Sequence, residues 1–142
     1  MNEYEILNLS GQYFINNAMY TVAVVIMTFV SFRIARVARD KNASVFGKVL
    51  VTIFGACNVF FGLQVSSYLV LQQKSQSFQL SELLASGVEI STSSKAIIKT
   101  MGHTVADGVP SLTPGVTGVI LWVTVALLII GITWLDLTKK EA

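Results

Sequence analysis

Three long apolar runs divide this chain, and polar residues gather in the two stretches between them. The runs centre on Tyr13–Phe32, Val49–Leu71 and Val116–Leu135, and none of them contains Asp, Glu, Lys or Arg. A helix needs about 20 apolar residues to cross a hydrocarbon core of about 30 Å. In lipid its backbone polar groups must be satisfied within the segment, which favours α-helix. The pattern predicts an all-α integral membrane protein with three transmembrane helices, at about residues 13–36, 46–72 and 116–136.

Composition supports a membrane location and a simple domain organisation. Charged residues make up 13% of the chain, whereas soluble domains carry about 25%, so the chain lacks the polar surface of a soluble globule. Three spans and one long loop, at residues 73–115, account for its length. We therefore expect a single membrane domain over residues 1–142. The net charge of +2 and the absence of a basic stripe with interleaved aromatics argue against nucleic-acid binding.

The positions of the basic residues predict the orientation. Five lie between the first two runs and are also candidates for contact with anionic lipid: Arg33, Arg36, Arg39, Lys41 and Lys48. Lys and Arg close to span ends are retained on the cytoplasmic side. We therefore expect an external N-terminus, an external loop at 73–115 and a cytoplasmic C-terminus, in agreement with Lys139 and Lys140. The alternatives are insertion in the opposite direction, or a bilayer in which this charge bias does not apply.

Turn and capping signals predict further detail outside the spans. The first helix should continue to a turn at Asp40–Asn42, and the second should begin near Ser44 as its N-cap. Polar residues at 72–79 should end the second span. The outer loop should hold two short amphipathic helices, one from Leu80 to a stop at Gly87 and one from about Ser91–Ser94 to a stop at Gly102. Their apolar residues are candidates for docking a partner: Leu83, Leu84, Ile97, Ile98 and Met101.

Small and weakly polar residues recur along one side of each predicted span. They are Thr21, Thr28 and Ala35 in the first, Gly55, Asn58, Gly62 and Ser66 in the second, and Thr117, Thr124 and Gly131 in the third. Small residues let membrane helices approach closely, and Asn or Thr can hydrogen-bond across the contact. Asn58 stands out because an unpaired amide in hydrocarbon is costly. The stripes predict a packed three-helix unit.

Residues that could perform chemistry are scarce. The spans hold no carboxylate, lysine or histidine, which argues against an ion-coupled transporter. Cys57 is the single cysteine, so neither an intramolecular disulfide nor a cysteine-based metal site is expected. His103 and Asp107 would share a face of a helix as a metal or proton-transfer pair, but the surrounding glycines and proline favour an exposed loop. We expect no enzymatic activity, no catalytic residues and no cofactor.

These observations leave three hypotheses for function. The leading one is a non-catalytic structural or accessory subunit, bound to lipids and other membrane subunits in a larger assembly of a bacterial inner membrane or of a virion membrane derived from it. The second is a homo-oligomeric pore or lesion former, with Asn58, Gln64 and Ser67 as its polar face. Three spans with an external N-terminus are similar in layout to phage holins, a similarity of topology that assigns no residue a role. The third is an accessory subunit of a redox or metalloenzyme complex, acting through His103.

Overall fold

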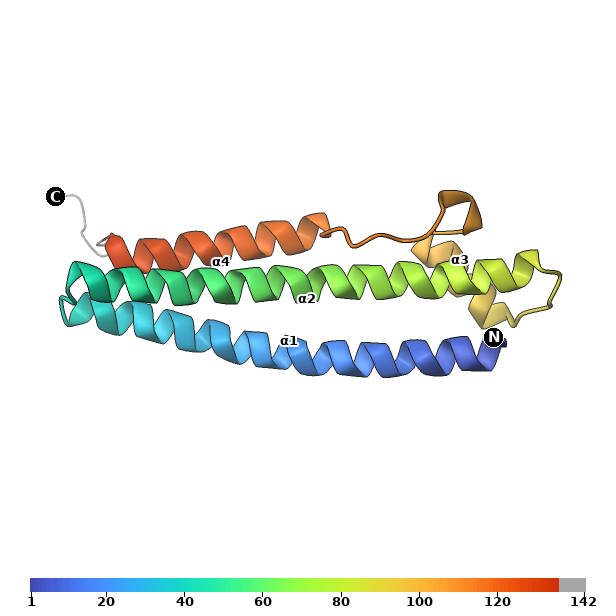
Figure 1. Ribbon diagram of the computed structural model, residues 1–142, viewed down its shortest axis with the longest axis horizontal. Coiled ribbons are helices and arrows are strands. Elements are labelled where there is room, and N and C mark those ends of the chain that lie inside the picture. Colours follow the sequence, from blue (N-terminus) through green and yellow to red (C-terminus); the bar gives the residue numbers. More distant parts are fainter. Residues whose placement is uncertain (136–142) are drawn as a thin grey trace. The chain divides into compact units, whose positions relative to one another are not determined.

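The computed structural model describes residues 1–135, and the elements that it defines there are helical (Figure 1). They are α1 (Glu3–Asp40), α2 (Val45–Ala85), α3 (Thr92–Met101), the 3₁₀ helix η1 (Val105–Asp107) and α4 (Val116–Trp134). By length and hydropathy α1, α2 and α4 can each cross a membrane. The prediction of three apolar spanning helices is therefore confirmed, and they indicate an integral membrane protein. Residue 136, the predicted end of the third span, and Lys139 and Lys140 lie outside the described residues.

Both long helices continue beyond the apolar runs that they contain. α1 has 38 residues and α2 has 41, about twice the length that a span requires. α1 begins at Glu3 because the side chains of Asn2 and Glu5 each cap the backbone of the other residue. The Asn2 backbone N–H donates to Glu5 Oε2, and the Glu5 backbone N–H donates to Asn2 Oδ1, each at 2.9 Å. The predicted separate helix from Leu80 to Gly87 is wrong, because α2 continues without a break through residues 72–79 to Ala85. Gln, Lys and Ser are too polar for a span but do not stop a helix, and the first glycine after them is Gly87, at φ +86°.

The predicted turn and two predicted caps are confirmed. α1 ends at Asp40 and α2 starts at Val45, with Asn42 in the left-handed region at φ +48°. The Ser44 hydroxyl accepts a hydrogen bond from the backbone N–H of Gly47 at 3.3 Å. α3 has Ser91 as its N-cap and Gly102, at φ +66°, as its C-cap. Each of these signals acts within one helical turn.

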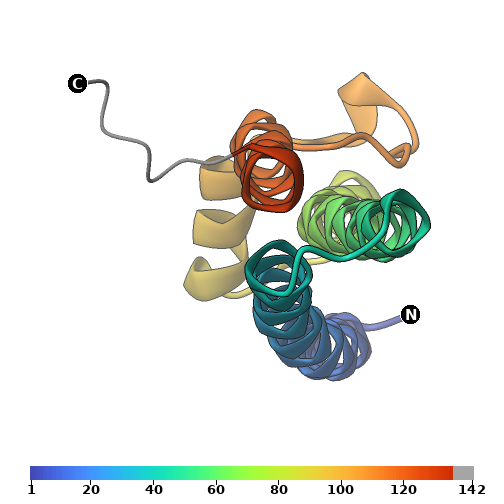
Figure 2. The same cartoon turned by 90° about the vertical axis from the view of Figure 1, so that its left-hand side faces the viewer.

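Contacts divide the chain into two units, which are described separately. Unit 2 combines residues 20–65 with the described residues from Gly115 onward. Figure 2 looks down its three helical segments, from α1, α2 and α4, which lie at the corners of a triangle. Their core is Val24, Trp122, Val125 and Ile129, with Phe32, Val59, Leu63 and Val65 packed around it. Unit 2 is thus a small three-helix bundle.

Unit 1 combines Met1–Met19 with Ser66–Pro114. It contains the first turns of α1, the last turns of α2, and residues 86–114 of the connection from α2 to α4, which include α3 and η1. Three apolar side chains are buried here, Ile6, Leu80 and Ile90. A larger set of buried residues is polar: Ser10, Asn17, Ser67, Gln76, Ser77, Ser81 and Ser94. Hydrogen bonds therefore carry much of the organisation of unit 1.

Candidate functional site

The small-residue stripe of α2 lies inside unit 2. Gly55, Asn58 and Gly62 are all buried there. A Cβ atom on Gly62 would come within 2.1 Å of Trp122 Cζ2, and one on Gly55 within 2.7 Å of Ile129 Cγ2. α4 therefore packs against the bare backbone of α2 at two positions seven residues apart. Ser66, the last residue of the stripe, is half-buried and belongs to unit 1.

A polar contact joins α2 to α1 inside the same bundle. Asn58 Nδ2 donates to Thr28 Oγ1 at 2.9 Å, and the Thr28 hydroxyl donates in turn to the carbonyl of Val24 at 2.8 Å. Asn58 is fully buried, and its Oδ1 atom has no hydrogen-bond partner among residues 1–135. The Asn58 side chain thus bonds to Thr28 through Nδ2, and its Oδ1 atom is left as an acceptor without a partner among the described residues.

The stripes of the first and third spans are only partly inside. Ala35 and Gly131 are buried and Thr28 is half-buried, whereas Thr21, Thr117 and Thr124 are exposed on the single chain. α4 instead turns a different set inward, namely Trp122, Val125, Ile129 and Thr133. The predicted helix-packing role of these three threonines stays a prediction.

The polar residues considered for a pore do not form one exposed surface. Asn58 and Ser67 are buried, whereas Gln64 is exposed. Asn58 is occupied with Thr28 inside unit 2, and Ser67 belongs to unit 1. Gln64 is therefore the one member of this set that is open to a lumen or to a partner.

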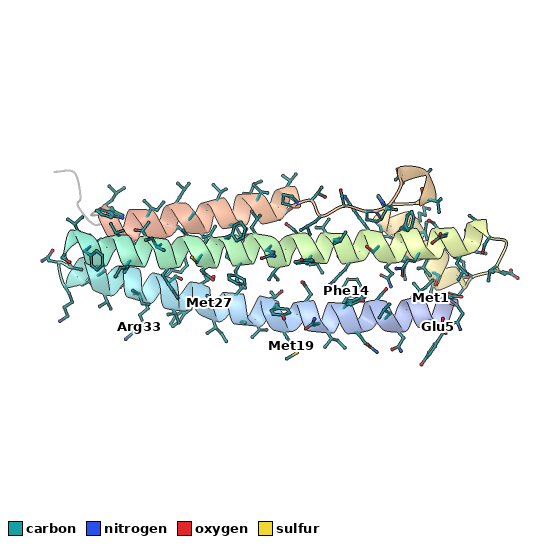
Figure 3. All side chains as sticks on the ribbon, in the orientation of Figure 1. Met1, Glu5, Phe14, Met19, Met27 and Arg33 are labelled. Atoms are coloured by element: carbon teal, nitrogen blue, oxygen red, sulfur yellow. The ribbon has the colours of Figure 1, made fainter. Side chains whose placement is uncertain are left out.

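The basic residues between the first two runs differ in their surroundings. Arg33, Arg36 and Lys41 are exposed, and Figure 3 shows Arg33 on the side of α1 that faces away from α2. Arg39 Nε contacts Asp40 Oδ1 at 3.3 Å. Lys48 lies over the Trp134 ring, with Nζ 5.8 Å from its centroid.

In unit 1, a single carboxylate ties the start of α1 to the start of α3. Glu3 accepts hydrogen bonds from the Ser91 and Ser94 hydroxyls, each at 2.5 Å, and from the Ser91 backbone N–H at 3.1 Å. The Ser91 hydroxyl, then the Ser94 hydroxyl and the Ser91 amide, hold the pKa of Glu3 below its ordinary value of 4.5. An acid at a helix N-terminus also complements the helix dipole. We call this contact the Glu3 clasp.

A second anchor attaches the segment after α3 to α2. The Ser77 hydroxyl donates to the His103 carbonyl at 2.7 Å, and the Val105 backbone N–H donates to Ser81 Oγ at 3.0 Å. The rings of Phe78 and His103 are tilted by 47° with centroids 6.4 Å apart. Two serines one helical turn apart on α2 thus bind the backbone of the connection.

His103 and Asp107 do not lie on one helical face, because α3 ends at Met101. His103 Nε2 contacts the Gly108 carbonyl at 2.9 Å, and Asp107 Oδ2 accepts from the Thr104 backbone N–H at 2.8 Å. That backbone bond, followed by the Thr104 hydroxyl, holds the pKa of Asp107 below its ordinary value of 3.8. Each side chain therefore binds its own loop. Within residues 1–135 no three His, Cys, Asp or Glu side chains gather as a metal site.

The predicted docking residues flank these anchors. Leu83, Ile97 and Ile98 are half-buried, and Leu84 and Met101 are exposed at 42% and 37%. Leu83 also lines a shallow hollow of unit 1 with Met1 and Ile6. Leu84 and Met101 thus keep part of their apolar surface open among residues 1–135.

Sequence reasoning missed two contacts that organise these regions. The Glu3 clasp joins Glu3 to Ser91 and Ser94, which are 88 and 91 positions away along the chain. Its only signal in the sequence was the S-x-x-S pattern at the start of α3 together with an acidic N-terminal segment. The close approach of Trp122 to Gly62 had no signal in the sequence, because α4 is almost uniformly apolar and nothing in it marks which side faces inward. Comparison of the chain with protein-family models, curated proteins and solved structures found no match.

Proposed function

We propose that this protein is a non-catalytic structural or accessory subunit of a larger membrane assembly. One observation carries the proposal: the α2–α4 connection is anchored at several points yet presents apolar side chains on its surface. The Glu3 clasp, Ser77 and Ser81 supply the anchors. An exposed apolar surface held in one arrangement is typical of a surface that binds another protein or the membrane.

The α2–α4 connection and the last turn of α2, which carries Leu84, expose several apolar residues. Relative exposures are 42% for Leu84, 46% for Val88, 37% for Met101, 44% for Val105, 82% for Val109 and 48% for Leu112. Burying one Val or Leu side chain contributes about 1.5–3 kcal/mol. Several such residues, contributed to one contact, supply enough free energy to hold a subunit in an assembly.

The spans also leave surface for neighbours. The most apolar windows of α1, α2 and α4 are only 17%, 22% and 28% buried within the chain. Lipid accounts for such surface equally well, so it supports membrane insertion more strongly than it supports a partner. The anchored connection is what favours a subunit over a lone membrane helix bundle.

The proposed setting is a bacterial inner membrane, or a virion membrane derived from it, with an external N-terminus. The positive-inside bias of the α1–α2 turn supports it. In a Cys57→Ala background, cysteines replacing Ser44 and Ser93, both exposed, report the two sides. A membrane-impermeant thiol reagent added to intact cells should label position 93 and spare position 44. Labelling of position 44 alone would reverse the proposed orientation.

A pair of variants tests the subunit proposal. Leu84→Ser with Met101→Ser removes two exposed apolar side chains without touching an anchor. Tagged protein extracted in mild detergent should then lose partners that co-purify at fixed stoichiometry with the wild type, while insertion persists. The matched control is Glu82→Ser with Lys95→Ser, which changes two exposed residues of the same region and leaves the net charge unchanged.

The pore hypothesis predicts a different outcome. Purified protein alone would release dye from liposomes, Gln64→Leu would reduce that release, and the Leu84 and Met101 variant would leave it intact. That combination, without any co-purifying subunit, would overturn the subunit proposal.

A further inference from the structure

A polar pocket of about 360 Å³ lies in unit 2 beside the α1–α2 turn. Arg39, Asp40 and Asn42 line it from the turn, Lys48 from the first turn of α2, and Thr133 and Trp134 from the last turn of α4. These residues stand at the ends of three apolar helices. In a membrane, that is the depth at which lipid headgroups meet the protein.

The charges in the pocket favour an anion. Arg39 and Lys48 bring two positive charges, and Asp40 brings one negative charge. Asp40 contacts Arg39 through Nε, a contact that does not use the two terminal guanidinium nitrogens. The Asp40 side chain is 56% exposed, and an exposed ion pair of this kind contributes little. A phosphate group with one negative charge would balance the pocket.

Trp134 gives the pocket a fixed wall. Its Nε1 atom donates to Thr52 Oγ1 on α2 at 2.9 Å, which sets the orientation of the ring. The same ring lies below the Lys48 ammonium at 5.8 Å, an arrangement that attracts a cation to the face of an indole. Lys48 is therefore kept beside Arg39 rather than extended into water.

We propose that this pocket binds the phosphate of an anionic phospholipid headgroup in the leaflet on the side of the α1–α2 turn. Arg39 donates two parallel hydrogen bonds to the phosphate oxygens, and Lys48 acts as a point charge. The acyl chains continue along the face of α4 below Trp134, where Leu127 and Ile130 are exposed at 65% and 46%. Among residues 1–135, Asp40 is the one carboxylate in the lining, so that part of the site offers no second acid to a choline group and should bind a zwitterionic lipid more weakly. The inference is independent of any partner subunit.

Native mass spectrometry of the full chain, released from mild detergent with added lipid, tests the site. Phosphatidylglycerol should bind the wild type more tightly than phosphatidylcholine of the same acyl chains. Arg39→Gln with Lys48→Gln should weaken phosphatidylglycerol binding at least about tenfold, since each basic residue near an anionic lipid surface contributes about 1 kcal/mol. The matched control is Arg33→Gln with Arg36→Gln, which removes the same charge from exposed positions outside the pocket and should weaken binding clearly less than Arg39→Gln with Lys48→Gln.

Three results would overturn the proposal. Equal affinity for the two lipids would remove the preference for an anion. Equal weakening of phosphatidylglycerol binding in the two double variants would mean that overall charge, and not the pocket, determines the affinity. Displacement of phosphatidylglycerol by millimolar inorganic phosphate would identify a site for the free anion. Circular dichroism of each variant shows whether the helices persist. Should Arg39→Gln with Lys48→Gln lose helix, quenching of wild-type tryptophan fluorescence by brominated phosphatidylglycerol, compared with brominated phosphatidylcholine, decides the question without a variant.

Discussion

The two units of this protein are stabilised by different kinds of contact. In unit 2, helices meet through bare glycine backbone against Trp122 and Ile129, supplemented by side-chain hydrogen bonds such as Asn58 to Thr28 and Trp134 to Thr52. In unit 1, serine hydroxyls and the Glu3 carboxylate bind backbone groups and a helix start. Close packing dominates the first unit, and directed hydrogen bonds dominate the second.

The difference follows from the solvent each region is expected to meet. Lipid tails are as apolar as Leu, so membrane helices associate through close van der Waals contact and a few polar bonds rather than through the hydrophobic effect. Most of unit 1 lies beyond the predicted spans, where water competes for every donor. There an irregular connection needs bonds at defined points to keep one arrangement. Substitutions should therefore destabilise unit 2 mainly when they change side-chain volume, and unit 1 mainly when they remove a hydrogen bond.

The largest effect is expected from added volume at Gly62. Its Cβ would overlap the Trp122 ring, at 2.1 to 2.3 Å from three ring atoms, and a flat indole cannot yield as a flexible chain does. Gly62→Ala should lower the free energy of unfolding by about 1–3 kcal/mol, the usual cost of overpacking, and Gly62→Leu by more. Gly55→Ala should be milder because the branched chain of Ile129 can shift. Thermal unfolding in detergent measures the series.

Phe60→Leu is the control for this series, since Phe60 is 69% exposed and should be nearly neutral. A compensating change sharpens the test. Trp122→Leu should recover part of the stability lost in Gly62→Ala, because it removes the ring that the new methyl meets. If Gly62→Ala matched the wild type, the close approach of α4 to α2 at this position would be refuted.

An intermediate effect is expected from Thr28→Val, which keeps the shape of the side chain and removes the hydroxyl. Asn58 Nδ2 would lose its acceptor in a fully buried position. Polar contacts between membrane helices contribute about 0.6–2 kcal/mol, and the unfolding free energy should fall by about that amount. A double-mutant cycle with Asn58→Leu separates the pair from each residue alone.

Thr124→Val is the matched control, because the Thr124 hydroxyl donates to the Ile120 carbonyl of its own helix. It should change stability less than Thr28→Val does. Zero coupling in the Thr28 and Asn58 cycle would mean that the contact does not stabilise unit 2.

The smallest and most local effect is expected from Glu3→Gln, which weakens the Glu3 clasp. Amide hydrogen exchange in α3 should accelerate while exchange in α4 stays unchanged. The pH dependence has a definite sign. The pKa of Glu3 is lower in the folded protein than its ordinary 4.5, so the clasp stabilises fully above pH 4.5 and is lost as pH falls through the lowered value.

In the wild type, the protection factors of the α3 amides should therefore fall as the pH drops through the lowered pKa of Glu3, and Glu3→Gln should lack this pH dependence. Glu5→Gln is the control, since the Glu5 carboxylate accepts from Asn2 within the same turn and does not reach α3. Identical pH profiles for wild type and Glu3→Gln would show that the clasp does not hold α3.

Several elements followed from the sequence because their causes are local. The apolar runs predicted α1, α2 and α4, because backbone polar groups left unpaired in lipid cost free energy and a helix pairs them within the segment. Asn42, Ser44, Ser91 and Gly102 predicted a turn and helix ends, because each acts on neighbours within one turn. The wrong prediction of a separate helix from Leu80 to Gly87 has the same origin. Polarity determines where a span can end, whereas a helix ends where backbone conformation changes, here at Ser86–Gly87.

The remaining features depend on tertiary structure. The rotation of each helix about its axis decides that Trp122 rather than Thr124 faces α2, and α4 is too uniformly apolar to encode that rotation in a periodic pattern. The Glu3 clasp and the pocket of Arg39, Lys48 and Trp134 join residues from separate elements. By itself the sequence determined which segments are helical and apolar enough to span a membrane, since those properties arise from neighbouring residues. Only the tertiary structure decided which faces meet, because that depends on the shapes of side chains distant in the chain.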